Sequence, residues 1–134
     1  MKKIVVETLV LEYVKRYRIP ARYEGRNVGH VYVYIIGDPA RTGGKACYAY
    51  VDDLLVDESV REKGGGRKLM EALLRVAKSE HCYKVIANCH RRRRAARALY
   101  SSMGFAPHGR EFRLDLLEQP RIPQGRAPGM NGCE

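Results

Sequence analysis

The feature that most constrains the fold is the junction at residues 54–66, where an apolar run passes through three consecutive glycines into the most regular helical pattern of the chain. In the helix predicted over residues 66–79, apolar positions recur at the i, i+3, i+4 spacing of an amphipathic helix. Glycines at such a turn let a ligand approach the backbone closely, and the free N–H groups of the first helical turn attract anions. The junction therefore predicts an anion cradle, with a flexible turn into a surface helix as the alternative.

Upstream of the junction the apolar pattern changes to that of strands. Segments 28–36 and 47–56 are rich in β-branched and aromatic residues, with turn-forming residues between them, so they are predicted to be adjacent antiparallel strands. Residues 24–27 are typical of a hairpin turn and make residues 13–23 an earlier strand. Residues 6–14 fit either a strand or a helix.

Downstream of the first helix the pattern predicts a buried strand at residues 83–88, a second helix over 92–103 with Gly104 as its stop, and a last strand at 111–117. The prolines and glycines after residue 118 indicate a flexible tail over 119–134. The predicted class is an α/β layered (α+β) domain over residues 1–118, with a mixed, mostly antiparallel central sheet flanked by helices.

Composition limits the class of protein. The chain has 134 residues, enough for one small domain with its own core. Since no apolar stretch reaches the ~18 residues of a membrane span and the start does not resemble a signal peptide, we expect a cytoplasmic protein without membrane contact. The cysteines form no CxxC pair, and about six strand residues separate His81-Cys82 from Cys89-His90, roughly 20 Å. No metal site is therefore expected.

The net charge of +10 favours anionic partners, among them nucleic acid, phosphorylated metabolites, coenzyme A and acidic proteins. Its densest part is the run Arg91–Arg94 with Arg97. This run fits a solvated helix face, or a contact with the phosphates of coenzyme A, with an anionic acceptor or with nucleic acid. No zinc-finger spacing or RNP-type aromatic pattern accompanies the arginines, which disfavours nucleic acid.

Two separated motifs carry a family resemblance. The pattern Arg61-x-x-Gly64-x-Gly66 follows a strand that ends in Leu55-Val56, and the segment LYSSMGF follows at residues 99–105. Together they resemble the two signature segments of the GNAT family of acyl-CoA-dependent N-acyltransferases, over about residues 28–117. The resemblance implies a GNAT-like fold and transfer of the acetyl group of acetyl-CoA to a primary amine, with acetyl-CoA as cosubstrate.

The resemblance also implies roles for particular residues. In that family the tyrosine that matches Tyr100 protonates the departing thiolate, the loop binds the pyrophosphate of coenzyme A, and the preceding strand contacts pantetheine. Glu62 departs from the family's usual glycine, and Asn88 replaces an acidic residue of the amino-sugar enzymes. The implied cofactor-binding residues are Leu54, Leu55, Val56, Arg61, Glu62, Lys63, Gly64, Gly65, Gly66, Arg67 and Asn88.

A base is needed because a protonated primary amine cannot attack a thioester. Asp52 and Asp53 lie on the strand before the cradle and are the candidates. Consecutive strand residues point to opposite faces, so only one of the two is expected to line the site. Either could instead be a solvated acid or the partner of an arginine.

The acceptor stays open between a small amine or amino sugar phosphate and a protein or peptide amine. Residues 51–56 and 82–86 resemble glucosamine-6-phosphate N-acetyltransferases, while the short N-terminal part implies an open acceptor side that suits a peptide. Cys47 or Cys89 as a covalent nucleophile is an unneeded alternative to direct transfer. The rival class is a basic coenzyme A- or nucleic-acid-binding module without catalysis, and either protein would be a monomer or homodimer.

Overall fold

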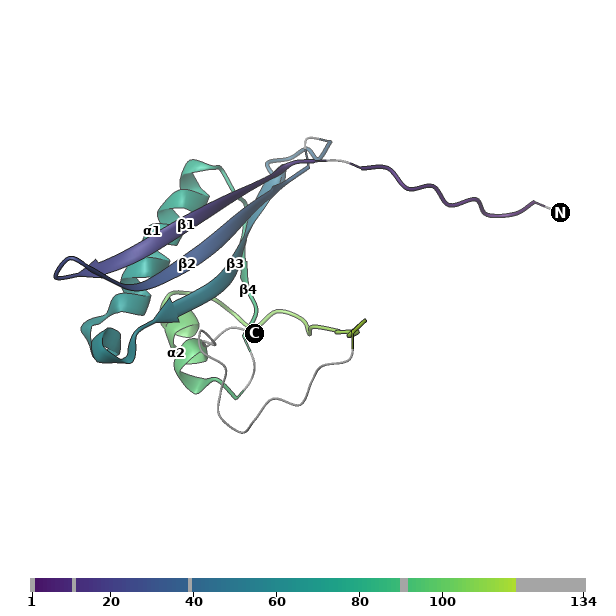
Figure 1. Cartoon of the computed structure of the whole chain (residues 1–134). Coiled ribbons are helices and arrows are strands. Elements are labelled where there is room, and N and C mark those ends of the chain that lie inside the picture. The colour runs from purple at the N-terminus through teal and green to yellow at the C-terminus, as the bar shows by residue number, and fades with distance from the viewer. Residues whose placement is uncertain (1, 11, 39, 90–91, 118–134) are drawn as a thin grey trace.

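The predicted strands form one sheet in the computed structural model, which describes residues 2–10, 12–38, 40–89 and 92–117 (Figure 1). The strand order is β1-β2-β3-β4, with β1 and β2 antiparallel, β2 and β3 antiparallel, and β3 and β4 parallel. Because the strands are mostly antiparallel and one pair is parallel, the predicted mixed sheet is confirmed. The bounds are Val14–Tyr23 for β1, Arg26–Gly37 for β2, Cys47–Val56 for β3 and Val85–Ala87 for β4.

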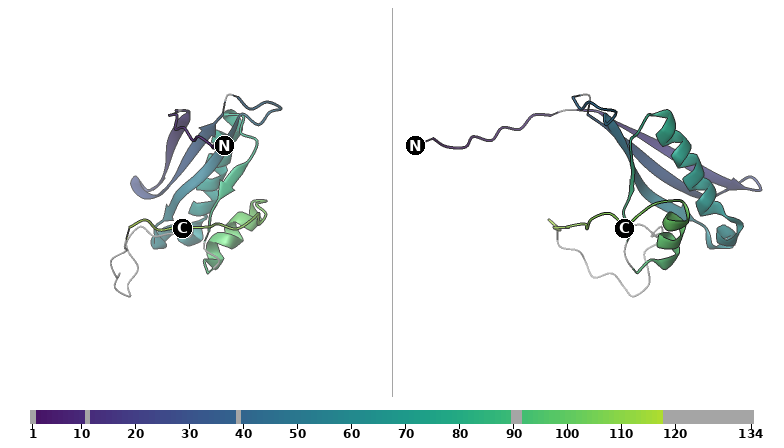
Figure 2. Two further views of the ribbon diagram at one scale, coloured as in Figure 1. Left: turned by 90° about the vertical axis from the view of Figure 1, so that its right-hand side faces the viewer. Right: turned by 180° about the vertical axis from the view of Figure 1, so that it is seen from behind.

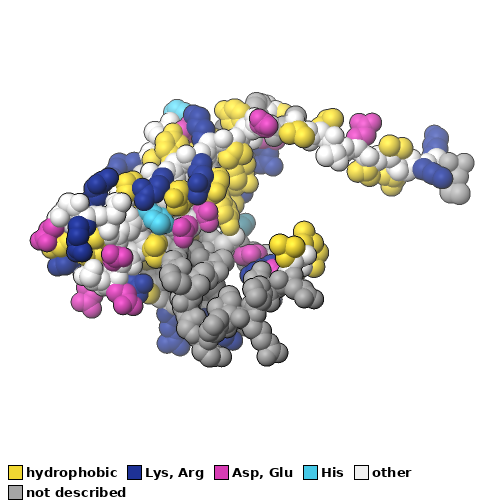
Figure 3. All heavy atoms as spheres, in the orientation of Figure 1, with side chains coloured by type: hydrophobic (Ala, Val, Ile, Leu, Met, Phe, Trp, Pro, Cys, Tyr) yellow, Lys and Arg dark blue, Asp and Glu magenta, His cyan; other side chains and the backbone are white. Residues whose placement is uncertain are grey.

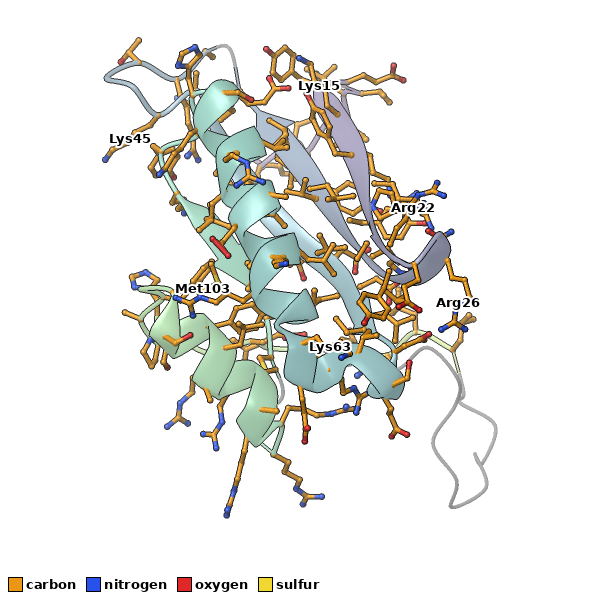
Figure 4. The ribbon with its side chains drawn as sticks, turned by 90° about the vertical axis from the view of Figure 1, so that its left-hand side faces the viewer. Lys15, Arg22, Arg26, Lys45, Lys63 and Met103 are labelled. Atoms are coloured by element: carbon orange, nitrogen blue, oxygen red, sulfur yellow. The ribbon has the colours of Figure 1, made fainter. Side chains whose placement is uncertain are left out.

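Two α-helices pack on the same face of this sheet (Figures 2 and 4). A 3-10 helix, η1 (Glu58–Lys63), leads from β3 into α1 (Gly65–Ser79), and α2 (Arg94–Ser102) follows β4. Val31 and Val33 of β2 are fully buried against a cluster that includes Met70 and Leu73 of α1. Both predicted helices are therefore confirmed, each with its apolar side in the core.

The other face of the sheet carries aromatic and charged side chains instead. The guanidinium carbon of Arg16 lies 3.8 Å from the ring centroid of Tyr32 and 5.4 Å from that of Tyr34. The strand register places Tyr50 opposite Tyr34 on this face. Figure 3 shows Lys and Arg side chains spread over the strands. No helix among the described residues covers this side, so we call it the open face.

Two sequence-based expectations about the ends are not met. Residues 111–117 are not a strand: Phe112 is 95% exposed and Leu114 83% exposed. The alternating pattern is present, but a strand also needs a neighbour to satisfy its backbone, and no described strand pairs with this segment. In residues 6–14, which could have been strand or helix, the described residues up to Tyr13 have no regular structure, and β1 begins only at Val14.

Other predicted elements have different bounds in the structure or lie outside the described residues. The strand predicted at residues 83–88 exists but is limited to Val85–Ala87 and is half-buried. His90, Arg91 and the tail predicted over 119–134 lie outside the described residues. Arg94 and Arg97 are exposed on α2, as predicted for the outward face of that helix, while Ala96 is buried.

Candidate functional site

Glycines shape the start of α1. Gly64 precedes the helix with φ at 78°, a left-handed conformation that favours glycine, and it offers no side chain to cap the first-turn N–H groups. A Cβ at Gly65 would lie 3.2 Å from Val56 of β3, and one at Gly66 would lie 3.2 Å from Leu99 of α2. The glycines therefore let the helix begin tightly between β3 and α2 while its N–H groups remain without a side-chain cap.

Three basic side chains predicted near the cradle surround this helix start, each directed to a different element. The Nε of Arg61 donates to the carbonyl oxygen of Val56 at 3.2 Å. The Lys63 ammonium lies 5.3 Å from the ring centroid of Tyr23, at the end of the sheet where Figure 4 also shows Arg22 and Arg26.

The third, Arg67, donates to the Ser102 hydroxyl of α2 at 3.1 Å. Glu62, the acidic departure from the family pattern, is exposed. Positive charge therefore surrounds the uncapped end of α1, which already attracts anions through its dipole.

At the end of β3 beside the cradle, the strand is no longer paired with β4. In the described part of the chain the β3–β4 ladder ends at the pair Val51–Ala87, and β3 continues through Leu54 to Val56 without pairing to β4. Just beyond β4, the side-chain amide of Asn88 donates to the Tyr50 hydroxyl at 2.9 Å. The main chain of residues 54–56 thus lies next to the glycine junction, whereas Asn88 is directed to the open face.

Tyr100 lies on the covered face. It is 5% exposed and belongs to the same hydrophobic cluster as Leu54 of β3. Its ring centroid lies 5.3 Å from that of Phe105, and the turn after α2 brings the Phe105 N–H to the Tyr100 carbonyl oxygen at 3.0 Å. Its predicted place on the apolar side of α2 is confirmed, and it shares the buried core of the covered face with Leu54 of β3.

A β-bulge changes the expectation for the two aspartates. Asp52 pairs with Tyr32 and Leu55 pairs with His30, so β3 has one residue more than β2 in this interval. The extra backbone turn is at Asp53, whose φ of 52° is left-handed. The prediction that consecutive acids must point to opposite faces is wrong here, because it assumed a regular strand; Asp53 instead reaches His30 on the face that carries Tyr32.

His30 was not among the residues predicted for the site. Its Nε2 lies 2.8 Å from Oδ2 of Asp53, and its side chain is 19% exposed against 43% for the aspartate. The ring also makes an edge contact with Tyr32, with centroids 5.1 Å apart. The pair forms only through the strand register and the bulge, so a lone histidine in an apolar strand gave no sequence signal for it.

A separate polar cluster lies at the end of the sheet far from the glycine junction, where Figure 4 shows Lys15. The Tyr17 hydroxyl donates to Glu80, just after α1, and the Lys15 ammonium donates to the same carboxylate at 3.2 Å. The hydrogen bond from Tyr17, followed by that from Lys15, lowers the pKa of the Glu80 carboxyl. This cluster connects β1 to α1 and contains none of the residues predicted for the site.

Two cysteines lie near this cluster. The sulfur atoms of Cys47 and Cys82 are 3.8 Å apart, and the Cys47 thiol also donates to the Glu80 carbonyl oxygen. Burial, with a contribution from the Cys47 hydrogen bond, raises the pKa of Cys82 to about 12. Cys47 begins β3, at the end far from the glycine junction, so its position does not suit a nucleophile acting there.

Comparison with known proteins places the chain in a family. The sequence profile of the Acetyltransferase (GNAT) family matches residues 6–105. The chain is 35% identical to glucosamine 6-phosphate N-acetyltransferase of Trypanosoma brucei brucei over 92 residues, which are 69% of this chain and 59% of that protein. It is 33% identical to probable glucosamine 6-phosphate N-acetyltransferase 2 of Oryza sativa subsp. japonica over 90 residues, 67% of this chain and 51% of that protein. The chain thus spans between half and three fifths of these relatives' length.

Solved structures agree with the sequence comparison. A Trypanosoma brucei acetyltransferase superposes with a TM-score of 0.62 at 31% identity, covering 77% of this chain and 69% of that one. Glucosamine-6-phosphate N-acetyltransferase of Arabidopsis thaliana gives a TM-score of 0.58 at 26% identity, covering 69% and 59%. None of the helices in the described ranges is long and apolar enough to cross a membrane. By sequence profile, by relatives and by fold, the chain belongs to the GNAT family of acetyltransferases.

Proposed function

We propose that this chain is an acetyl-CoA-dependent N-acetyltransferase that moves the acetyl group directly to a primary amine. The observation that carries the proposal is the uncapped start of α1 beside the end of β3 that lacks a β4 partner. A helix N-terminus with nearby Arg and Lys suits a pyrophosphate, and a free strand edge suits an extended chain of amides. Acetyl-CoA carries both groups, and membership of the GNAT family supports the same ligand.

We assign the pyrophosphate to the first turn of α1, at Gly64–Gly66, with Arg61, Lys63 and Arg67 supplying positive charge. The main chain of residues 54–56 is assigned to the pantetheine amides. The exposure of Glu62 supports this arrangement, because a carboxylate in solvent is well screened from the bound anion.

In the proposed reaction the amine nitrogen forms a bond to the thioester carbonyl carbon while the bond from that carbon to sulfur breaks. The departing thiolate takes a proton from the Tyr100 hydroxyl. Tyr100 belongs to the same buried cluster as Leu54, a residue of the strand proposed to bind pantetheine, and this supports the role. A positioned general acid of this kind contributes about 100-fold or more to the rate.

Two observations bear on the acceptor class, and they point to different amines. The relatives named above act, by name, on glucosamine 6-phosphate. In this chain Asn88, an amide, replaces the acid of those enzymes and is bound to Tyr50, and no described helix covers the open face. The acceptors to be compared are therefore glucosamine 6-phosphate, simple primary amines and lysine peptides.

The test is release of free thiol from acetyl-CoA with each acceptor, together with thermal unfolding in the presence of acetyl-CoA or ATP. The proposal predicts a rise in unfolding temperature with acetyl-CoA that ATP does not reproduce, and thiol release with at least one amine class. Strongly salt-dependent binding of DNA or RNA, without stabilisation by acetyl-CoA, would instead identify a basic binding module.

A further inference from the structure

We propose that His30 is the base that takes the proton of the acceptor amine and that Asp53 holds its ring in position. The inference rests on the proposed acetyl transfer and adds a catalytic residue on the open face. It starts from the contact between His30 Nε2 and Asp53 Oδ2, which is 2.8 Å long.

The contact depends on an unusual backbone. Asp53 is the extra residue of the bulge between the pairs Asp52–Tyr32 and Leu55–His30, and its φ is 52°. Aspartate tolerates the left-handed region better than most residues, yet such conformations persist only where the surroundings hold them, and they cluster at active sites. Here the conformation carries a carboxylate to the histidine across the strand pair.

The contact also fixes which ring nitrogen can act. A neutral imidazole donates from one nitrogen and accepts at the other. With Nε2 donating to the Asp53 carboxylate, the lone pair is on Nδ1, and a carboxylate in this place stabilises the imidazolium that forms when Nδ1 takes a proton. The edge contact with Tyr32 and an exposure of 19% restrict the ring while leaving part of it open to solvent.

The bulge places His30 and Asp53 close to the strand segment assigned to pantetheine. The bulge follows Asp52, the residue after Val51, whose pair with Ala87 is the last of the β3–β4 ladder in the described chain, and its extra residue Asp53 directly precedes residues 54–56. A base at this point lies beside the strand segment assigned to pantetheine, on the face that the described helices leave uncovered.

The ionisable groups around His30 come from three strands. Asp53 and Asp52 are on β3, the latter opposite Tyr32 in the register, and Tyr32 is on the same strand as His30. On β1 the residue opposite His30 is Pro20, and its neighbours along the strand on that face are Arg18 and Arg22. Asp53 is the one that an observed hydrogen bond joins to the ring, so it is the group we assign as the positioning residue.

Nδ1 of His30 first takes a proton from the acceptor ammonium and releases it to solvent, which frees the nitrogen lone pair. As the neutral amine nitrogen then bonds to the thioester carbon and the bond from carbon to sulfur breaks, a second N–H proton moves to Nδ1 of His30, and the sulfur receives the Tyr100 proton. The imidazolium then releases its proton to solvent, and the tyrosinate takes one back. No further reactant is needed.

The test compares His30→Ala and Asp53→Asn with the wild type, using thiol release with the acceptor found active. We expect His30→Ala to lower kcat about 100-fold, and added imidazole to restore part of the loss. Asp53→Asn should lower kcat less and displace the acid limb of the pH–rate profile. The dissociation constant of acetyl-CoA, measured by calorimetry, should stay within about twofold in both variants, which shows that they are folded. His108→Ala, at an exposed histidine outside the strands, is the matched control.

A His30→Ala enzyme with wild-type kcat and pH profile would overturn the inference alone. So would a loss that imidazole does not restore in a variant that still binds acetyl-CoA normally. Absence of thiol release by the wild type with every acceptor class would overturn the proposed function, and the inference with it.

Discussion

The two faces of the sheet use alternate residues of the same strands for different purposes. On the covered face, Val31 and Val33 are fully buried beneath α1, and the glycine junction and Tyr100 are packed at the edge of that core. On the open face the alternate residues of β2, His30, Tyr32 and Tyr34, form polar and cation–π contacts and remain partly exposed. A rigid core thus positions groups whose own side chains are not part of it.

The two faces also differ in what fixes the positions of their side chains. In the open-face pair His30–Asp53 the side chains are 19% and 43% exposed, so the geometry of the pair depends on the strand register and the bulge as well as on burial. The covered face fixes that register through its packing. Changes to the apolar side chains of the core should therefore affect stability, whereas changes at His30 and Asp53 should affect chemistry.

The largest expected effect is on the covered face. Leu73→Ala removes a fully buried side chain of α1 and should lower the free energy of unfolding by about 2–5 kcal/mol. Ile36→Ala, at a half-buried aliphatic residue on the open face, is the matched variant and should cost clearly less. Urea unfolding measures both. Equal losses would show that the two faces do not differ in the way described.

Next in size is the loss expected for Tyr100→Phe. Removing one hydroxyl should lower kcat about 100-fold because the thiolate loses its proton donor. Acetyl-CoA affinity should be unchanged. Tyr83→Phe, at an exposed tyrosine, is the control. Unchanged turnover in Tyr100→Phe would remove its assigned role and leave it a core aromatic.

A smaller effect is expected at the cradle. Arg61→Ala should weaken acetyl-CoA binding about tenfold, the size of one charge-assisted hydrogen bond. The difference from wild type should shrink at high salt, since exposed charges are screened. Calorimetric titration at two salt concentrations tests this, with Arg75→Ala on the exposed side of α1 as control. Equal affinity for both variants would place the pyrophosphate elsewhere.

The smallest expected effect is on pH-dependent stability. The pKa of Glu80 is lowered by Tyr17 and then by Lys15, so its carboxylate stabilises the fold above the unfolded-state pKa, and this contribution is lost as pH falls through the folded-state pKa. Glu80→Gln should therefore destabilise the protein at neutral pH, and the difference should disappear in acid. Unfolding at several pH values, with Glu71→Gln as control, checks the sign. A difference that grows in acid would contradict it.

Local pattern was enough to predict much of the covered face. The apolar spacing at Leu69, Met70 and Leu73 predicted α1 and its buried side, and the glycines before it predicted where the helix begins. These features depend on residues close together in the sequence. The same holds for the hairpin turn at Glu24-Gly25, which joins β1 to β2.

The failures came from contacts between distant residues. The bulge at Asp53 is a property of the β2–β3 register, and an alternation rule applied to one strand does not reveal it. Because the alternation rule does not predict the bulge, it does not predict the contact between Asp53 and His30 either. The strand predicted at residues 111–117 had the right alternation, with Phe112 and Leu114 on one side, but no described strand pairs with it.

The most direct test of the division between the two faces is steady-state kinetics of thiol release, with acetyl-CoA and the acceptor varied separately in Arg61→Ala and His30→Ala. We predict that Arg61→Ala raises KM for acetyl-CoA with little change in kcat. His30→Ala should lower kcat and leave KM for acetyl-CoA unchanged. If both variants changed the same parameter to the same extent, the assignment of cofactor binding to the cradle and of amine deprotonation to the open face would be contradicted.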